Sequence, residues 1–114
     1  MIKVIFEDKK PTLTLTIEGH ANYAEDGSDI VCSAVSILAH TLAEHAAVLY
    51  EKGYITKPDL KIEKGDYFLS CTGDENSFPY LQDKFAFVQL GMDIIKSTFP
   101  DNVSVTKLWE SVKD

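Results

Sequence analysis

The chain has 114 residues, 45% of them hydrophobic and 25% charged, which is the profile of one globular domain with its own core. Its 18 acidic and 11 basic side chains give a net charge of −7, which argues against nucleic-acid binding and favours a basic protein partner. No apolar run approaches the roughly 20 residues of a membrane span. The N-terminal MIKVIFEDKK predicts a strand instead of a signal peptide, so we expect a cytoplasmic protein that does not bind a membrane.

Hydrophobic periodicity divides the chain into seven elements without repeats or linkers. The order ββαββαβ predicts one α+β domain over 1–114, in two layers, with two helices on one face of a mainly antiparallel or mixed sheet. A charged turn at 7–11 separates the first two strands, and 18–29 form a loop. The expected elements are strands at 1–6 and 12–17, a helix at 30–52, strands at 60–63 and 67–71, a helix at 77–98, and a strand at 103–108.

The two helices carry different patterns. The first begins after Ser28 or Asp29 as N-cap and ends at Gly53. Its polar residues form one narrow stripe, so we expect a helix buried on most sides. The second has an unbroken apolar stripe from Phe78 to Phe99 that predicts core packing. It also has a second apolar line, which one sheet cannot easily cover and which suggests a subunit interface. The polar stripe is Ser33, Ser36, His40 and Glu44; the second apolar line is Tyr80, Phe87, Leu90 and Ile94.

Cys32 and Cys71 are far apart and form no CxxC motif, so two free thiols are expected in a reducing compartment. Cys71 ends an apolar strand and is expected to be structural. Cys32 lies at a helix start, where the helix dipole favours a thiolate. Small neighbours leave room for a substrate, and a histidine on the preceding loop could act as base. The alternative is a small buried hydrophobe.

Among the three histidines, only His20 could reach Cys32. His40 and His45 lie on the same helix, roughly 12 and 20 Å along it at about 1.5 Å per residue. His40 and Glu44 have a metal-ligand spacing, but no third ligand stands out, so neither a metal nor another cofactor is expected.

Two neighbouring residues have competing interpretations. Asp29 could orient the imidazolium or only cap the helix. Ser36, one turn beyond Cys32, could orient His20, hold a water, or bond to its own helix backbone. Backbone N–H groups near Cys32 and Ser33 are candidates for an oxyanion hole.

The segments Gly19-His20-Ala21, Tyr23-Ala24 and Gly27-Ser28-Asp29-Ile30-Val31-Cys32-Ser33-Ala34-Val35-Ser36 resemble the signature of the ribosomal-processing cysteine protease family Prp. The resemblance extends over essentially the whole chain. It implies a small cytoplasmic homodimer of α+β fold that removes the N-terminal extension of a large-subunit ribosomal protein, cutting after a hydrophobic segment that ends in aromatic residues.

The resemblance also implies residue roles. Cys32 would be the nucleophile and His20 the general base, with Asp29 and Ser36 as supporting residues and Gly19 giving the histidine loop its freedom. The loop between His20 and Cys32 would cover the substrate, as a glycine-flanked lid. Its acidic residues near the mouth would favour a basic substrate. The loop residues are Ala21, Asn22, Tyr23, Ala24, Glu25, Asp26, Gly27 and Ser28.

Two other functions compete with the protease. One is a non-catalytic module, or ribosome-assembly factor, that binds the same extension without cutting it. The other is a structural dimer in which Cys32 and His20 only pack.

Overall fold

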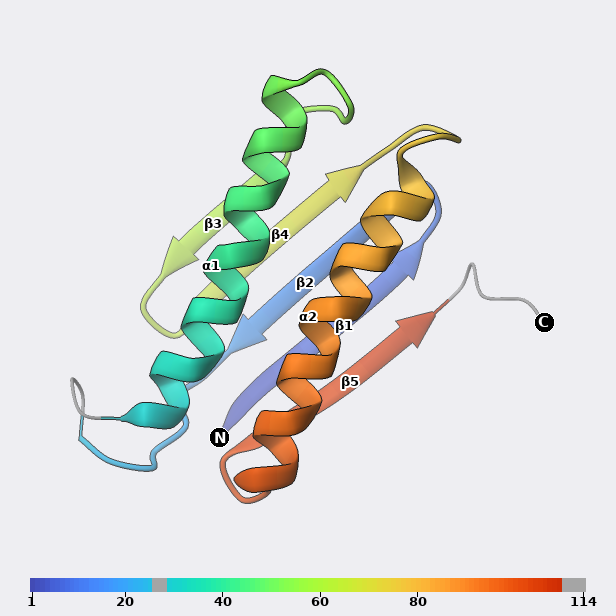
Figure 1. Cartoon of the computed structure of the whole chain (residues 1–114). Coiled ribbons are helices and arrows are strands. Elements are labelled where there is room, and N and C mark those ends of the chain that lie inside the picture. Colours follow the sequence, from blue (N-terminus) through green and yellow to red (C-terminus); the bar gives the residue numbers. More distant parts are fainter. Residues whose placement is uncertain (26–28, 110–114) are drawn as a thin grey trace.

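The computed structural model describes residues 1–25 and 29–109. Two helices lie next to each other on one face of a five-stranded mixed sheet, as Figure 1 shows, so the predicted α+β fold and its order are confirmed. The strand order is β3-β4-β2-β1-β5, in which only the β1–β5 pair is parallel. The elements are β1 (Ile2–Lys9), β2 (Thr12–Glu18), α1 (Ile30–Glu51), β3 (Asp59–Glu63), β4 (Asp66–Thr72), α2 (Phe78–Thr98) and β5 (Val103–Trp109).

Alternating side chains of the three central strands form the floor of the core beneath the helices, as the period of a strand requires. β1 continues to Lys9, so the charged turn expected at 7–11 is confined to Lys10 and Pro11, and its expected extent over 7–9 was wrong. Asp8 points inward and is buried, and its Oδ2 accepts a hydrogen bond from Gln82 Nε2 at 2.8 Å. Because this bond satisfies the buried carboxylate, the strand can run on to Lys9. The buried hydrophobic residues of these three strands are Ile2, Val4 and Phe6, then Leu13, Leu15 and Ile17, then Tyr67, Leu69 and Cys71.

Helix α1 begins at the expected cap, Asp29, and packs through one face only. The expectation that it is buried on most sides was wrong, because the sheet and α2 cover a single side of it. Ile37, on the outer side, is 65% exposed. The buried residues of α1 are Val31, Val35, Ala39, Leu42, Ala43, Ala46 and Leu49.

By length and composition alone, α1 could cross a membrane, since it has 22 residues and contains an 18-residue stretch with a mean hydropathy of 1.4. The expectation that no segment approaches a span was therefore wrong. In the fold, the buried side chains of this helix belong to the same core cluster as those of the sheet and α2. This is the setting of a core helix in an α+β domain.

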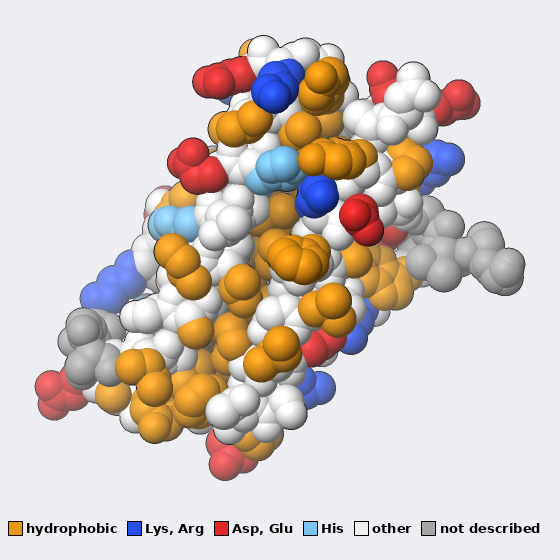
Figure 2. Space-filling model, in the orientation of Figure 1, with side chains coloured by type: hydrophobic (Ala, Val, Ile, Leu, Met, Phe, Trp, Pro, Cys, Tyr) orange, Lys and Arg blue, Asp and Glu red, His pale blue; other side chains and the backbone are white. Residues whose placement is uncertain are grey.

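Helix α2 carries both apolar lines that the sequence predicts. Phe78, Leu81, Phe85, Val88 and Met92 are buried against the sheet, as expected. The second line points outward, with Phe87 76% exposed and Ile94 67% exposed. Figure 2 shows apolar side chains over the two helices, on the face away from the sheet. The sheet therefore does not cover both lines.

Candidate active site

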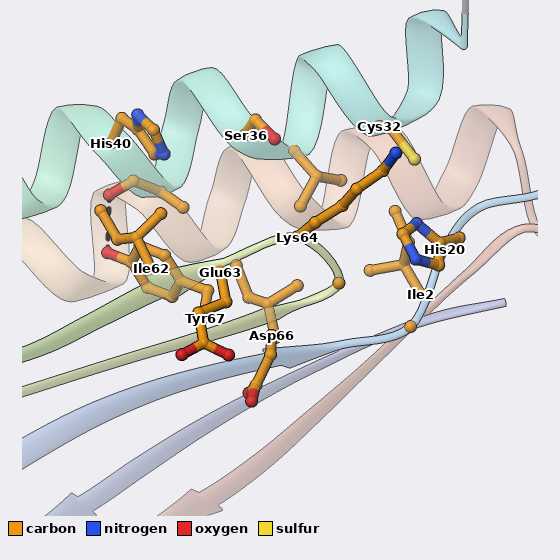
Figure 3. Close-up of a pocket in the computed structure, with 15 residues that line it drawn as sticks. Ile2, His20, Cys32, Ser36, His40, Ile62, Glu63, Lys64, Asp66 and Tyr67 are labelled. Atoms are coloured by element: carbon orange, nitrogen blue, oxygen red, sulfur yellow. Dashed lines mark hydrogen bonds between the residues drawn. The ribbon is translucent and has the colours of Figure 1, made fainter. Parts of the chain in front are cut away.

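A groove of about 340 Å³ follows α1 on the side of the β3–β4 hairpin (Figure 3). Cys32 and His20 lie at one end of it, and His40 and Ile62 lie toward the other. Its walls come from α1, from the end of β2 and from the β3–β4 hairpin. The lining residues are Cys32, Val35, Ser36, Ala39 and His40 of α1; Ile2, Ile17, Gly19 and His20; and Ile62, Glu63, Lys64, Gly65, Asp66 and Tyr67.

A second hollow, also about 340 Å³, meets the groove at the predicted nucleophile and base. His20 and Cys32 are the residues that both spaces share. The second hollow is otherwise lined by Asn22, Ala24, Glu25 and Asp29. A chain lying across Cys32 therefore finds space on either side of the thiol.

Cys32 lies in the first turn of α1, where the helix dipole favours an anion. Its side chain is partly exposed, and the Ala21 N–H donates to Sγ at 3.4 Å. Cys71, by contrast, is fully buried, and burial raises the pKa of its thiol to about 12, in keeping with the expected structural role.

The two backbone N–H groups expected to form an oxyanion hole already donate hydrogen bonds within the protein. Cys32 N donates to Asp29 Oδ1 at 3.0 Å, and Ser33 N donates to the Asp29 carbonyl at 3.1 Å. These are the bonds that an N-cap residue makes at a helix start. The expectation for this pair was therefore wrong in this structure.

Asp29 is buried, and four backbone N–H groups donate to its carboxylate. Oδ1 accepts from Val31 and Cys32, each at 3.0 Å, while Oδ2 accepts from Tyr23 at 3.0 Å and Ala24 at 3.4 Å. Burial raises the pKa of this carboxyl, but the four donors outweigh it and hold the pKa below its ordinary value. Of the two interpretations left open, the cap is present; within residues 1–25 and 29–109, no hydrogen bond joins Asp29 to His20.

His20 follows Gly19 directly after β2, and its ring lies beneath Cys32 at the end of the groove (Figure 3). His40 and His45 lie elsewhere, as expected: His40 is near the far end of the groove, and the His45 ring lies 5.8 Å from that of Tyr80. Among the described residues, neither ring nitrogen of His20 has a hydrogen-bond partner.

Gly19 has a steric reason to be glycine. Its φ is +92°, and a Cβ there would lie 2.5 Å from the carbonyl oxygen of Met1. Ser36 is exposed and lines the groove between Cys32 and His40. In the described part of the chain its hydroxyl makes no hydrogen bond, so of the three alternatives neither a bond to His20 nor one to its own helix backbone is seen.

The first half of the loop between His20 and Cys32 is fastened to the rest of the fold. Ala21 is buried, and its carbonyl accepts a hydrogen bond from Asn102 Nδ2 at 2.9 Å. The Tyr23 ring meets the Phe99 ring edge-on at 5.2 Å. Together with the two bonds to Asp29, these contacts hold 21–24 in place; Asp26, Gly27 and Ser28 lie outside the described residues.

Sequence reasoning missed Gly65, Asn102 and Tyr67 as parts of this site. Tyr67 lines the groove, donates from its hydroxyl to the Ala39 carbonyl at 2.7 Å, and stacks near the His40 ring. The Lys64-Gly65 turn is visible in the sequence as a hairpin. Nothing in the sequence, however, indicates that this hairpin reaches His20.

No metal centre accompanies these residues within the described ranges. In 1–25 and 29–109, no three His, Cys, Asp or Glu side chains come together as metal ligands.

The fold and the site together define a class: an α+β protein with a free cysteine at a helix N-terminus and a histidine beside it. The family model described as cysteine protease Prp matches residues 1–104, and the chain belongs to that family. The family predicted from the Gly-His and Asp-Ile-Val-Cys segments is therefore confirmed.

Solved structures of similar fold agree with this assignment. The essential ribosomal processing protease Prp from S. aureus, with a covalently linked product peptide, has a TM-score of 0.71 at 16% identity, covering 94% of this chain and 99% of that one. The same S. aureus protease with a substrate peptide has a TM-score of 0.67, again at 16% identity, covering 94% and 99%. SMU.848 from Streptococcus mutans is 26% identical, with a TM-score of 0.69 and 96% of each chain covered. None of the curated proteins matches this chain significantly.

Proposed function

We propose that this protein is a cysteine endopeptidase that removes the N-terminal extension of a large-subunit ribosomal protein. Cys32 is the nucleophile and His20 the general base. The observation that carries the proposal is the position of this pair, at the start of α1 and at the junction of two hollows. Membership of the Prp family supports a protease, and the S. aureus relative's processing activity supports the ribosomal substrate.

The reaction follows from the chemistry of the pair. His20 takes the thiol proton, and Sγ attacks the scissile carbonyl carbon to give a tetrahedral intermediate. The intermediate collapses as the protonated imidazole gives its proton to the leaving amine, which departs and leaves a thioester on Cys32. Water then attacks the thioester with His20 again as base, releasing the new carboxyl end and the thiol.

The substrate lies extended along the groove between α1 and the β3–β4 hairpin. The apolar side chains of Val35, Ile62 and Tyr67 suit the hydrophobic segment that precedes the cut. The second hollow receives the other side of the scissile bond. Of the acids expected to attract a basic substrate, Glu25 lines this hollow, whereas Asp29 is buried and bonded to backbone.

The exposed apolar line of α2 joins two copies in a homodimer, and the protein works in the cytoplasm without binding nucleic acid directly. The length of the outward line, from Tyr80 to Ile94, supports the dimer. The net charge of −7 supports the exclusion of nucleic acid.

The test is a mass-spectrometric cleavage assay on the extended ribosomal protein from the same cell. The wild type should make one cut, which Cys32→Ala and His20→Ala abolish. Cys71→Ala and His45→Gln are the matched controls, since neither residue lies in the groove or in the second hollow, and both should keep cleaving. Binding of the extension without any cut by folded, reduced wild type would instead establish a non-catalytic module or assembly factor.

A further inference from the structure

A cysteine–histidine pair works only if the imidazole is held toward the thiol. A third residue, often a carboxylate or amide, commonly provides this by bonding to the far ring nitrogen. Here, neither nitrogen of His20 bonds to any residue in 1–25 or 29–109. Asp29, the carboxylate that the sequence suggested for this role, already accepts hydrogen bonds from four backbone N–H groups. The ring must therefore be held in another way.

The backbone on both sides of His20 is fixed. On one side, Gly19 N donates to the Gly65 carbonyl at 3.0 Å, which ties the end of β2 to the β3–β4 turn. On the other side, Ala21 donates to Cys32 Sγ and accepts from Asn102. What remains free is rotation of the imidazole about its own side-chain bonds.

The β3–β4 turn limits this rotation. A Cβ on Gly65 would lie 2.7 Å from His20 Nε2, a distance that real Cβ atoms essentially never show, and 3.1 Å from Cε1, which is a tight contact. The imidazole thus rests directly against the Gly65 backbone. Gly65 also has φ of +75°, so its turn conformation itself favours glycine.

We propose that Gly65 is the positioning residue of His20: the bare backbone of the β3–β4 turn holds the imidazole toward Cys32 by contact, in place of a third polar residue. The inference rests on the proposed function, because it concerns the base of that reaction. Any side chain at position 65 displaces the ring, and displacement of about 1 Å in a catalytic group can cost about a hundredfold in rate.

Gly53 provides a matched control. It also has a positive φ, +81°, but a Cβ there meets nothing within 4 Å. Gly53→Ala and Gly53→Asn therefore report the cost of the backbone conformation alone. Gly65→Ala and Gly65→Asn add the contact with His20, and asparagine tolerates positive φ better than alanine does.

The experiment compares these four variants with wild type by melting temperature, by steady-state cleavage and by NMR of the His20 ring through its pH titration. We expect the Gly65 variants to lower kcat at least about tenfold with KM within about twofold, and to shift the His20 ring resonances. The Gly53 variants should lose a similar amount of thermal stability, but their kcat and their His20 ring resonances should stay as in wild type. Folded Gly65 variants with wild-type kcat and unmoved His20 resonances would overturn the proposal. So would unfolding of both Gly65 variants beside folded Gly53 variants, because Gly65 would then be structural.

The NMR comparison separates this inference from the proposed function. If wild type cuts no peptide, the protease assignment fails, yet a His20 ring that moves only in the Gly65 variants still supports positioning by Gly65. If wild type cuts the peptide and the His20 resonances do not shift in the Gly65 variants, the protease assignment is supported and the positioning role of Gly65 is refuted.

Discussion

At the scale of single residues, Asp29 connects the helix that carries the thiol to the loop that follows the histidine. Asp29→Asn should lower both cleavage rate and melting temperature, because the neutral amide cannot accept at both former oxygens. Asp74 is the matched control: its carboxylate accepts from Asn76 N and Ser77 N in the turn just before α2, outside the groove. Asp74→Asn should lower stability and leave cleavage intact. Equal loss of activity in both variants would contradict a local role for Asp29.

The lowered pKa of Asp29 also predicts a pH dependence. A carboxyl whose pKa is lower in the folded state stabilises that state above its unfolded pKa, near 3.8, and loses this contribution as pH falls through the folded value. The melting-temperature difference between wild type and Asp29→Asn should therefore shrink on acidification from about pH 5 to about pH 2. Melting curves across this range test it, and a constant difference would show that the ionised carboxylate contributes nothing.

The two thiols should differ sharply in reactivity. Cys32 is partly exposed at a helix start, whereas Cys71 is fully buried with a pKa of about 12. In the native protein at neutral pH, iodoacetamide should label Cys32 and leave Cys71 unlabelled until denaturant is added. Peptide mapping by mass spectrometry after timed labelling measures this. Equal labelling rates at both cysteines would indicate that Cys32 is only a packing residue.

At the scale of elements, β3 is an exposed edge strand whose two apolar residues allow a matched comparison. Leu60 and Ile62 lie on the same face of the strand and are 49% and 48% exposed, but only Ile62 lines the groove. Ile62→Asp should raise KM for the peptide about tenfold through lost apolar contact, with kcat little changed. Leu60→Asp should leave KM near wild type. Equal effects of the two variants would place the substrate elsewhere.

At the scale of the whole molecule, the apolar line on α2 predicts self-association. Phe87→Glu should convert a dimer to a monomer in analytical ultracentrifugation, because it buries a charge in an apolar contact. Leu108→Glu is the control: Leu108 is 49% exposed and pairs with Glu7 on β1, away from the helices. A monomeric wild type, or dissociation by both changes, would contradict the proposed interface.

The sequence by itself determined the elements and pointed to His20 and Cys32, the two residues that we propose as the catalytic pair. Alternation in the strands, the two helical stripes and the Asp29 cap are local patterns of period and hydrogen bonding, and they are readable residue by residue. The spacing of His20 and Cys32 likewise placed one at a strand end and the other at a helix start. Where local reasoning failed, at the turn expected over 7–11, a distant partner, Gln82, had satisfied the buried Asp8.

Only the tertiary structure decided what surrounds that pair. Gly65 and Asn102 reach the histidine loop from 45 to 82 positions away in the chain, because β4 pairs with β2 and the loop before β5 lies beside the start of β1. Such contacts depend on strand order, which local periodicity does not encode. The same holds for α1. Its apolar composition predicted burial on most sides, but among residues 1–25 and 29–109 one helix and one sheet cover it, on a single side. The residue types of the site can thus be predicted from the sequence, whereas the contacts that position its histidine depend on the fold.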